Sequence, residues 1–318
     1  MLECTLRRRG DRALDIPIPW KLFAPRWKQG RYDVHDALSL ALLSQLPYER
    51  RRRKGSTPAQ DRAHRTALVE RHGWFPDGYE EVRVRKGGDI DTLAVLGRRD
   101  GVLVVAFRGS ASLADWIANL QAVRDPGPLD ATKVHEGFQD AVHAAVMALT
   151  LRIVAMRRPE EAVWITGHSL GGAQAALLAG MLCENGVPVG GVYSYAAPRP
   201  GDKEYAAALN AALAGVAHYR VVNEGDLVPH LPPEPLYSHA GTVRVLRERD
   251  AKVETGAKSR SLWKRIRKRF IDWYDTLTDG QFVVKEIHVL ADDKGYLPPL
   301  LAAAGYVLRD GRWQEAAG

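Results

Sequence analysis

The fold is indicated most clearly by one segment, Ala162-Val-Trp-Ile-Thr-Gly-His-Ser-Leu-Gly-Gly-Ala-Gln-Ala-Ala-Leu-Leu-Ala179. Its first residues form a short apolar run, which is typical of a buried strand, and its last residues are small and apolar, which suits a packed helix. Between them, Gly167-His-Ser-Leu-Gly171 fits the pattern G-x-S-x-G. This pattern also occurs by chance, but a strand before it and a helix after it are the setting of a nucleophile elbow. The stretch therefore predicts Ser169 as a nucleophile.

The glycines of this pattern have a physical reason. A serine on so sharp a turn has a strained backbone, and bulky neighbours would clash with the strand and helix packed beside it. The turn lifts the Ser169 hydroxyl clear of the sheet. The N-terminus of the following helix then favours negative charge that develops beside the hydroxyl.

Strands and helices alternate along the rest of the chain. Apolar runs predict strands at Glu80–Arg85, Thr92–Leu96, Leu103–Phe107, Ala162–Thr166, Val192–Ala196, His218–Val222 and Thr242–Leu246. Helical spacing of apolar residues predicts helices at Asp33–Leu46, His135–Met156, Ala173–Cys183 and Ser261–Leu277, and the stretch from Pro47 to about Pro76 is polar and basic. This alternation predicts an α/β-hydrolase fold, with a mostly parallel central sheet and helices on both faces.

The chain is expected to form one domain. It has 318 residues, of which 46% are hydrophobic, and this is enough for a large core. No composition shift, linker or internal repeat divides it. We expect a single α/β-hydrolase domain over residues 1–318, with an N-terminal extension at about 1–30 and a basic amphipathic helix at about 258–278.

The nucleophile needs an acid and a base. A serine hydroxyl is a poor nucleophile until a base takes its proton, and in this fold an acid and then a histidine follow the serine along the chain. Asp226 follows the predicted strand His218–Val222, at the end of the strand where such sheets place functional groups. Glu224 lies in the same segment and is the alternative acid.

Three histidines lie beyond Asp226. His230 is only four residues further on in the same loop, which is close for a residue that must reach across to Ser169. His239 precedes the last strand, where a structural role is the simpler interpretation. His288 comes after that strand, where a late loop can fold back over the sheet edge. Position favours His288 as the base, but spacing by itself leaves His239 and His230 open.

Acyl transfer also requires hydrogen-bond donors for the tetrahedral oxyanion. One is expected to be the backbone N–H of Leu170, the residue after the nucleophile, and the other comes from a loop after an earlier strand. The strand Leu103–Phe107 runs into Arg108-Gly-Ser110, which supplies such a loop. Ser110 offers both an N–H and a hydroxyl there.

Several further segments accompany the elbow in a fixed order. They are Ala106-Phe-Arg-Gly-Ser110 with Asp115-Trp116 and Asn119, Val134-His-Glu-Gly-Phe138, Gly167-His-Ser-Leu-Gly-Gly172, Ala197-Pro-Arg-Pro-Gly-Asp202 and Asn223-Glu-Gly-Asp-Leu-Val-Pro-His230. Together they resemble the class 3 (fungal-type) lipase family, over about residues 33–288. The ordered set is far more specific than any one of its motifs.

The resemblance implies roles for individual residues. It implies Ser169 as nucleophile, Asp226 as acid, and Ser110 with Leu170 as oxyanion hole. The segment Tyr237-Ser-His-Ala-Gly241 resembles a family segment whose histidine is not catalytic, which favours His288. Secreted family members carry a signal and disulfides. This chain has neither a signal-like segment nor a disulfide framework, because its only cysteines are Cys4 and Cys183, so the resemblance is to an intracellular relative.

Composition limits location and partners. No stretch approaches the roughly 18 apolar residues of a membrane span, so a cytoplasmic location is expected, with peripheral membrane association or export without a cleaved signal as alternatives. The net charge of +7 is concentrated at Arg50–Lys54 and Lys258–Arg269. The second run belongs to the predicted helix Ser261–Leu277, which has tryptophans on its apolar face and could lie against an anionic membrane or simply pack on the domain. No recognised nucleic-acid module accompanies the charge, so nucleic acid is not an expected partner.

The sequence thus predicts a serine hydrolase that cleaves carboxylic esters of lipids through an acyl-enzyme, as a lipase or a phospholipase A1 does. The alternative is a catalytically silent hydrolase fold that serves as a binding or interaction module. No metal and no cofactor are expected. His135-Glu136 has no second histidine at the spacing of H-E-x-x-H, and neither a P-loop nor a dinucleotide fingerprint is present.

Overall fold

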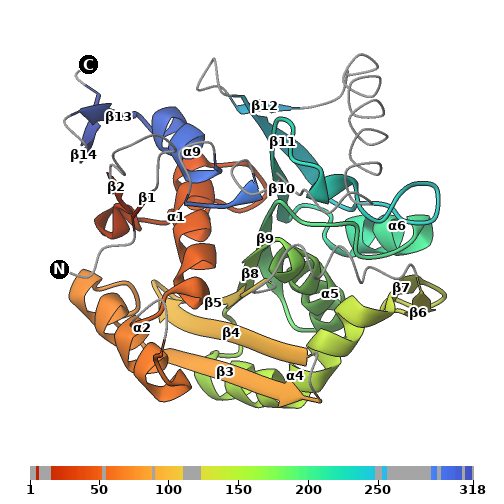
Figure 1. Ribbon diagram of the computed structural model, residues 1–318. Coiled ribbons are helices and arrows are strands. Elements are labelled where there is room, and N and C mark those ends of the chain that lie inside the picture. The colour runs from red at the N-terminus through yellow and green to blue at the C-terminus, as the bar shows by residue number, and fades with distance from the viewer. Residues whose placement is uncertain are drawn as a thin grey trace.

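An eight-stranded sheet forms the centre of the computed structural model (Figure 1). The structure describes residues 5–6, 16–51, 55–87, 90–109, 123–247, 253–255, 288–291, 295–309 and 312–316. The strand order is β12-β11-β10-β9-β8-β5-β4-β3. These strands are β3 (Tyr79–Lys86), β4 (Ile90–Arg99), β5 (Val102–Phe107), β8 (Val163–His168), β9 (Val189–Tyr195), β10 (Ala217–Asn223), β11 (Thr242–Leu246) and β12 (Val253–Thr255). Every strand predicted from the sequence is present.

The middle of the sheet is parallel and its edges are antiparallel. Each neighbouring pair from β5 through β8, β9 and β10 to β11 runs parallel, whereas β3, β4 and β12 join antiparallel. In register, Phe107 lies opposite Gly167, and Val221 lies opposite Tyr195. The segments that follow β5, β8, β9 and β10 therefore begin at one edge of the sheet, where open α/β sheets place their sites. The predicted α/β-hydrolase fold is confirmed.

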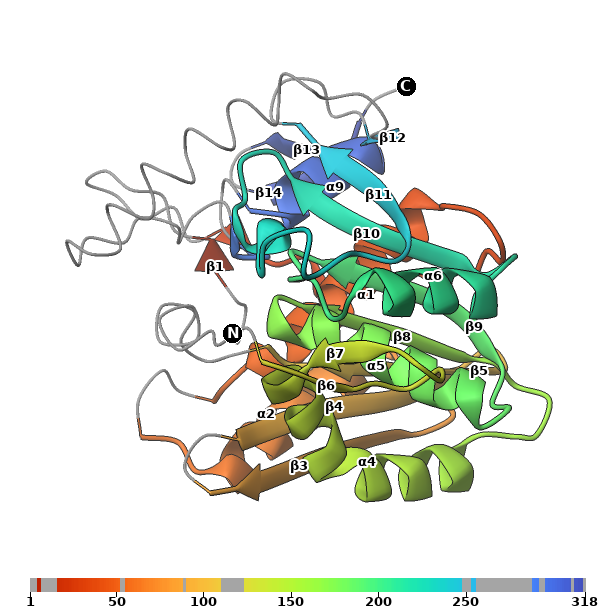
Figure 2. The ribbon, with the colours of Figure 1, turned by 90° about the vertical axis from the view of Figure 1, so that its right-hand side faces the viewer.

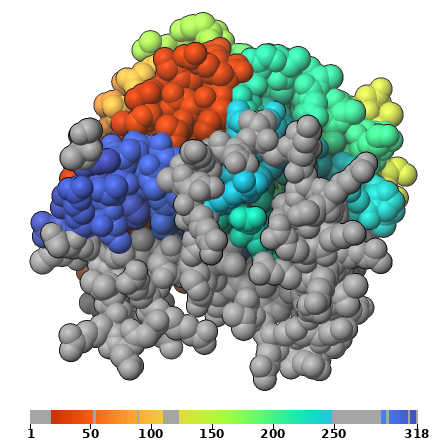
Figure 3. Space-filling view, turned by 90° about the horizontal axis from the view of Figure 1, so that it is seen from above, coloured from red at the N-terminus to blue at the C-terminus, as the bar shows by residue number. Residues whose placement is uncertain are grey.

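Helices cover both faces of the sheet (Figure 2). On one face lie α1 (Val34–Gln45) and α9 (Leu297–Ala303), and on the other lie α4 (Glu136–Met156), α5 (Leu170–Glu184) and α6 (Lys203–Ala212). The space-filling view from above shows the C-terminal segment beside the segment that holds α1 (Figure 3). Each face of the sheet has its own cluster of buried hydrophobic side chains.

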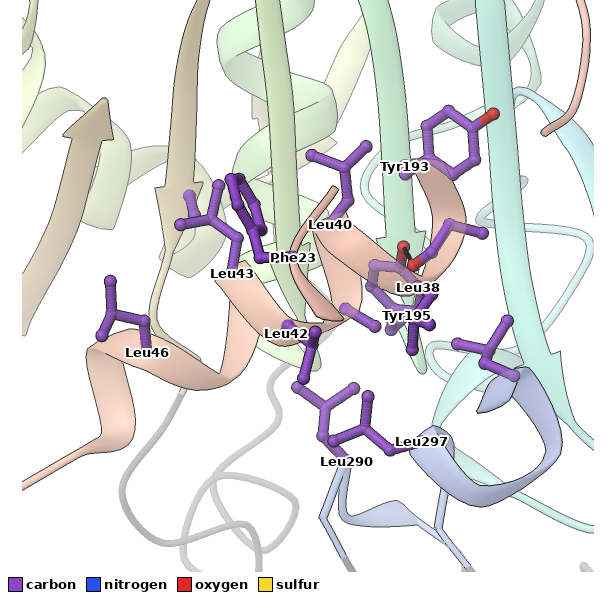
Figure 4. Close-up of a cluster of buried hydrophobic side chains, with 14 of the residues drawn as sticks. Phe23, Leu38, Leu40, Leu42, Leu43, Leu46, Tyr193, Tyr195, Leu290 and Leu297 are labelled. Carbon is purple, nitrogen blue, oxygen red and sulfur yellow. Dashed lines mark hydrogen bonds between the residues drawn. The ribbon is translucent and has the colours of Figure 1, made fainter. Parts of the chain in front are cut away.

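Strand β5 shows how the sheet divides these cores. Val104 and Ala106 pack in the cluster that contains α1, whereas Val105 and Phe107 pack in the cluster that contains α4 and α5. Side chains alternate between the faces of a strand, so an apolar run such as β5 serves both cores. Figure 4 shows the first cluster, whose labelled side chains are Phe23, Leu38, Leu40, Leu42, Leu43, Leu46, Tyr193, Tyr195, Leu290 and Leu297.

Helix α1 begins and ends where the sequence places it. The Asp33 carboxylate accepts hydrogen bonds from the backbone N–H groups of His35 and Asp36, as an N-cap residue does. The Asp36 carboxylate then accepts three backbone N–H groups, those of residues 26–28. Trp20 is also buried in the core beside α1. Part of the predicted N-terminal extension is therefore packed on the domain.

Some elements escaped sequence prediction. The short ones are β1 (Thr5–Leu6), β2 (Ile16–Pro17), η1 (Trp20–Leu22), η2 (Leu46–Tyr48), β6 (Arg124–Pro126), β7 (Lys133–His135), η3 (Val228–His230), β12, β13 (Tyr306–Arg309) and β14 (Arg312–Glu315), and the sequence patterns also do not predict α6 and α9. Helix α2 (Pro58–His72) lies in the stretch described only as polar and basic. Its signals were present: Thr57 and Gln60 form a capping box, Pro58 is at the first position and Gly73 is left-handed. The predicted helix at 258–278 lies outside the described residues.

Helix α4 is long and apolar enough to cross a membrane, by length and composition only. The sequence prediction that no stretch approaches such a span was therefore too strict. In the structure, Phe138, Val142, Leu149 and Ile153 of this helix are buried against the sheet. One face of the helix therefore packs against the sheet.

One salt bridge far from the sheet edge described above predicts a pH dependence of stability. Arg98 of β4 donates to Glu161, the residue two before β8, with Nε 3.0 Å from Oε2. These hydrogen bonds hold the pKa of the Glu161 carboxyl at about 2, below the ordinary 4.5. Because the pKa is lower in the folded state, this stabilisation is complete above the unfolded pKa and is lost as the pH falls towards 2.

We therefore expect Glu161→Gln to lower the melting temperature at neutral pH and to lower it much less near the folded-state pKa of about 2. Circular dichroism of thermal unfolding over this pH range measures the difference. A loss of the same size at both ends of the range would contradict the assignment.

Candidate active site

Ser169 lies at the turn between β8 and α5. Its φ of 57° and ψ of −131° lie in a region that non-glycine residues rarely adopt. Its backbone N–H donates to the carbonyl oxygen of Tyr195, at 2.9 Å, and this contact ties the turn to β9. The side chain is 4% exposed. A strained serine held between a strand and a helix is the geometry of a nucleophile elbow.

Both glycines of the pattern are required by close contact. A Cβ atom on Gly167 would lie 2.2 Å from the carbonyl oxygen of Gly171. A Cβ atom on Gly171 would lie 2.5 Å from the carbonyl oxygen of Phe107, at the end of β5. Both contacts are with backbone atoms, which cannot turn away as a side chain can. The turn therefore brings the start of α5 against β5 at a spacing that only glycine allows.

Asp226 follows β10 and is buried, with 1% exposure. Its carboxylate accepts three hydrogen bonds. The Val228 backbone N–H donates to Oδ1 at 3.0 Å, the Tyr296 hydroxyl donates to Oδ2 at 2.6 Å, and His288 Nδ1 lies 2.9 Å from Oδ2. A buried carboxylate is costly unless it is paired in this way. Tyr296 had not been singled out from the sequence, although it lies in the predicted late loop region.

His288 is the histidine that the structure brings to Asp226. The carboxylate can only accept, so Nδ1 carries a proton, and in a neutral ring Nε2 then presents its lone pair. Nε2 is buried and has no hydrogen-bond partner among the described residues. The ring lies against the elbow, because its centroid is 4.8 Å from that of His168, the residue before Ser169. The ring is thus held by Asp226 at one nitrogen and lies next to the residue that precedes the predicted nucleophile.

The alternative acid, Glu224, and the alternative bases, His230 and His239, have different surroundings. Glu224 is exposed, whereas Asp226 is buried. His239 Nε2 lies 2.7 Å from the carbonyl oxygen of Pro229, and burial lowers its pKa well below the ordinary value. Burial, with the charge of Arg199, also lowers the pKa of His230 to about 4. Among the residues that the structure describes, His239 has no hydrogen bond to Asp226.

The predicted oxyanion donors are described in part. Leu170 is the first residue of α5, where an N–H has no acceptor within the helix, so its position suits an oxyanion donor. Ser110 lies outside the described residues, as do Asp115, Trp116 and Asn119. Gly109, the residue before Ser110, is described and lies close to the turn at Ser169. A Cβ atom on Gly109 would be 3.2 Å from the Ser169 Cβ atom and 2.6 Å from the carbonyl oxygen of His168.

The arrangement is suited to nucleophilic chemistry. A strained serine at the start of a helix, and a histidine that is bound to a buried carboxylate and lies next to the residue before that serine, are the groups that such chemistry uses. Across the described ranges, no group of three or more His, Cys, Asp or Glu side chains is placed to hold a metal ion. Fold and site together define a serine-hydrolase arrangement on an α/β-hydrolase sheet.

Comparison with known proteins narrows the class. Residues 104–236 match the family model for lipase (class 3). The chain is 37% identical over 178 residues to a lipase of Rhizomucor miehei, covering 52% of this chain and 48% of the relative. It is 30% identical over 215 residues to phospholipase A1-II 6 of Oryza sativa subsp. japonica, covering 57% and 50%. The chain therefore spans about half the length of the curated relatives it matches.

Solved structures of lipases align with most of this chain. A deletion mutant of the Rhizomucor miehei lipase in its propeptide complex aligns with a TM-score of 0.54 at 27% identity, over 70% of each chain. A lipase of Rhizopus microsporus var. chinensis aligns with a TM-score of 0.52 at 25% identity, over 63% of this chain and 72% of that one. Over these residues the chain is similar to class 3 lipases, and the resemblance stated from the sequence motifs is confirmed.

Proposed function

We propose that the chain hydrolyses carboxylic esters of lipids through an acyl-enzyme on Ser169. His288 Nε2 accepts the hydroxyl proton as Ser169 Oγ attacks the ester carbonyl carbon, and Asp226 stabilises the resulting imidazolium. The backbone N–H groups of Leu170 and Ser110 hold the oxyanion. The imidazolium then gives its proton to the departing alcohol oxygen.

The second half of the reaction repeats the first with water. His288 Nε2 accepts a proton from water, whose oxygen attacks the acyl carbon, and the same proton returns to Ser169 Oγ as the acid leaves. The chain ends the cycle unchanged, and one water is consumed for each ester bond broken. No metal or cofactor takes part in this proposal.

One observation carries the proposal most directly. The Asp226 carboxylate lies 2.9 Å from His288 Nδ1, while His288 Nε2 is buried and unpaired among the described residues. A histidine with a structural role would be expected to use both nitrogens, as buried polar groups generally do. An imidazole anchored at one nitrogen and free at the other is ready to accept a proton.

A lipid ester is the substrate class that the relatives support. The relatives include a lipase and a phospholipase A1, and the finer choice between triacylglycerol and phospholipid is part of the proposal. We also propose peripheral contact with anionic membranes through residues 258–278, where aromatic and basic residues alternate at helical spacing. A cytoplasmic location remains part of the same proposal.

The test compares hydrolysis of p-nitrophenyl esters of increasing acyl length with release of fatty acid from two kinds of vesicle. One kind contains anionic phosphatidylglycerol and the other only neutral phosphatidylcholine. We expect hydrolysis of the esters, a preference for longer acyl chains because they bury more apolar surface, and faster release from anionic vesicles.

Each result has a separate meaning. Hydrolysis of short esters without release from either vesicle would restrict the activity to soluble esters and would contradict the lipid substrate. Equal release from both vesicles would contradict the membrane contact only. Absence of hydrolysis on every ester would favour the silent binding module.

A further inference from the structure

A chain of hydrogen bonds links four separate segments of the protein near the predicted catalytic residues. The Gly109 backbone N–H donates to Tyr48 Oη at 2.9 Å. Tyr48 Oη lies 3.3 Å from His168 Nδ1, and His168 Nε2 lies 2.6 Å from the carbonyl oxygen of His288. Tyr48 ends η2, Gly109 follows β5, and His168 ends β8. None of the three predicted catalytic side chains takes part in these bonds.

The direction of every bond in this chain is determined. An amide N–H can only donate and a carbonyl oxygen can only accept, so the two ends fix the protons between them. His168 therefore carries its proton on Nε2 and accepts at Nδ1 from the Tyr48 hydroxyl, whose oxygen accepts from Gly109. Burial and the neighbouring His288 lower the pKa of His168 to about 3, so the ring stays neutral. Burial also raises the pKa of Tyr48 above its ordinary value, so its hydroxyl stays protonated.

The chain of hydrogen bonds reaches the predicted oxyanion loop, the nucleophile turn and the predicted base, whose positions the reaction requires. Gly109 precedes Ser110, the predicted second oxyanion donor, and His168 precedes Ser169. His288 is held at two points: Asp226 binds the ring, and His168 binds the main chain. Ring orientation and backbone position together set where Nε2 points, so both anchors affect its placement.

We propose that Tyr48 and His168 are positioning residues, which fix the oxyanion loop at Gly109 and the backbone of His288 relative to the nucleophile turn. This inference rests on the proposed ester hydrolysis. Neither side chain contacts the reacting atoms in this scheme. Both act through the residues to which they are bonded, so their loss affects the chemical step rather than the binding of substrate.

The test measures kcat, KM and melting temperature with p-nitrophenyl butyrate for Tyr48→Phe, His168→Leu and His168→Gln. The matched control is Tyr205→Phe, because the Tyr205 hydroxyl is also buried and donates to a backbone carbonyl, that of Ala176, at 2.8 Å. Tyr205 lies on α6, outside the site. Glutamine at position 168 can still donate to the His288 carbonyl, whereas leucine cannot.

We expect Tyr48→Phe to lower kcat about 10- to 100-fold with little change in KM, since misplacement by about 1 Å can cost this much. The control should lose a similar amount of thermal stability and keep its kcat. His168→Leu should lower kcat at least as far as Tyr48→Phe does, and His168→Gln should recover most of that loss.

Three outcomes would contradict the positioning role. If Tyr48→Phe and Tyr205→Phe have the same kcat, or if glutamine at position 168 is no better than leucine, the positioning role is wrong while the proposed function stands. If the wild type neither hydrolyses esters nor forms a fluorophosphonate adduct, the proposed function fails, and the positioning role falls with it. The wild-type measurement therefore distinguishes the two failures.

Discussion

Replacement of Ser169 by alanine is expected to abolish ester hydrolysis. The loss in kcat should be on the order of 10⁴- to 10⁶-fold, because no acyl-enzyme can form without the hydroxyl. What remains is the activity that an oxyanion hole and a bound substrate lend to water. The measurement is the rate of p-nitrophenol release by wild type and variant at saturating ester, at equal concentrations of folded protein.

A buried serine elsewhere provides the control. Ser44 of α1 is buried, and its Oγ lies 3.0 Å from Thr166 Oγ1. Ser44→Ala removes the same group from a position outside the site, so its kcat should stay near that of the wild type. If Ser169→Ala retained even a tenth of the wild-type rate, Ser169 would not be the nucleophile.

The second large effect is expected for Asp226→Asn. An asparagine amide can donate to His288 Nδ1, which then gives up its proton, and the proton moves to Nε2. A ring protonated at Nε2 cannot accept the proton of Ser169. We expect a loss in kcat on the order of 10⁴-fold, as is found when the acid of such a triad is replaced in this way.

Glu224→Gln is the matched control for this prediction. Glu224 lies two residues away on the same loop and is exposed, so its replacement should leave kcat near the wild-type value. Melting temperatures of both variants show whether the loop stays folded, since Asp226 also accepts from Val228 and Tyr296. A large loss for Glu224→Gln with none for Asp226→Asn would reverse the assignment of the acid.

The parts of this site that the sequence predicts are those with local signals. The elbow is read from a strand, a G-x-S-x-G turn and a helix within one short stretch, and α1 is read from its apolar spacing and its stop at Pro47. Asp226 is placed by its position after a strand. Chain position and the family resemblance favour His288 but leave His230 and His239 open, and its 2.9 Å contact with Asp226 is a result of the fold.

The remaining contacts could not be read from the sequence, because they join residues far apart along the chain. Tyr296 and Asp226 are separated by 70 residues, and Tyr48 and His168 by 120. A lone tyrosine in either segment gives no sign of its partner until the strands are assembled. Helix α2 is a different case, because the sequence contains its capping box. Its composition is mostly polar, however, so the apolar positions Leu68 and Val69, which pack in the core, do not stand out.

The most direct test of the central claim is covalent labelling of the wild-type protein with a fluorophosphonate, followed by intact mass and peptide mapping. We predict one adduct per chain, located on Ser169, and no adduct after Ser169→Ala. An unlabelled wild type, or an adduct on another residue, would contradict the assignment of Ser169 as an activated nucleophile.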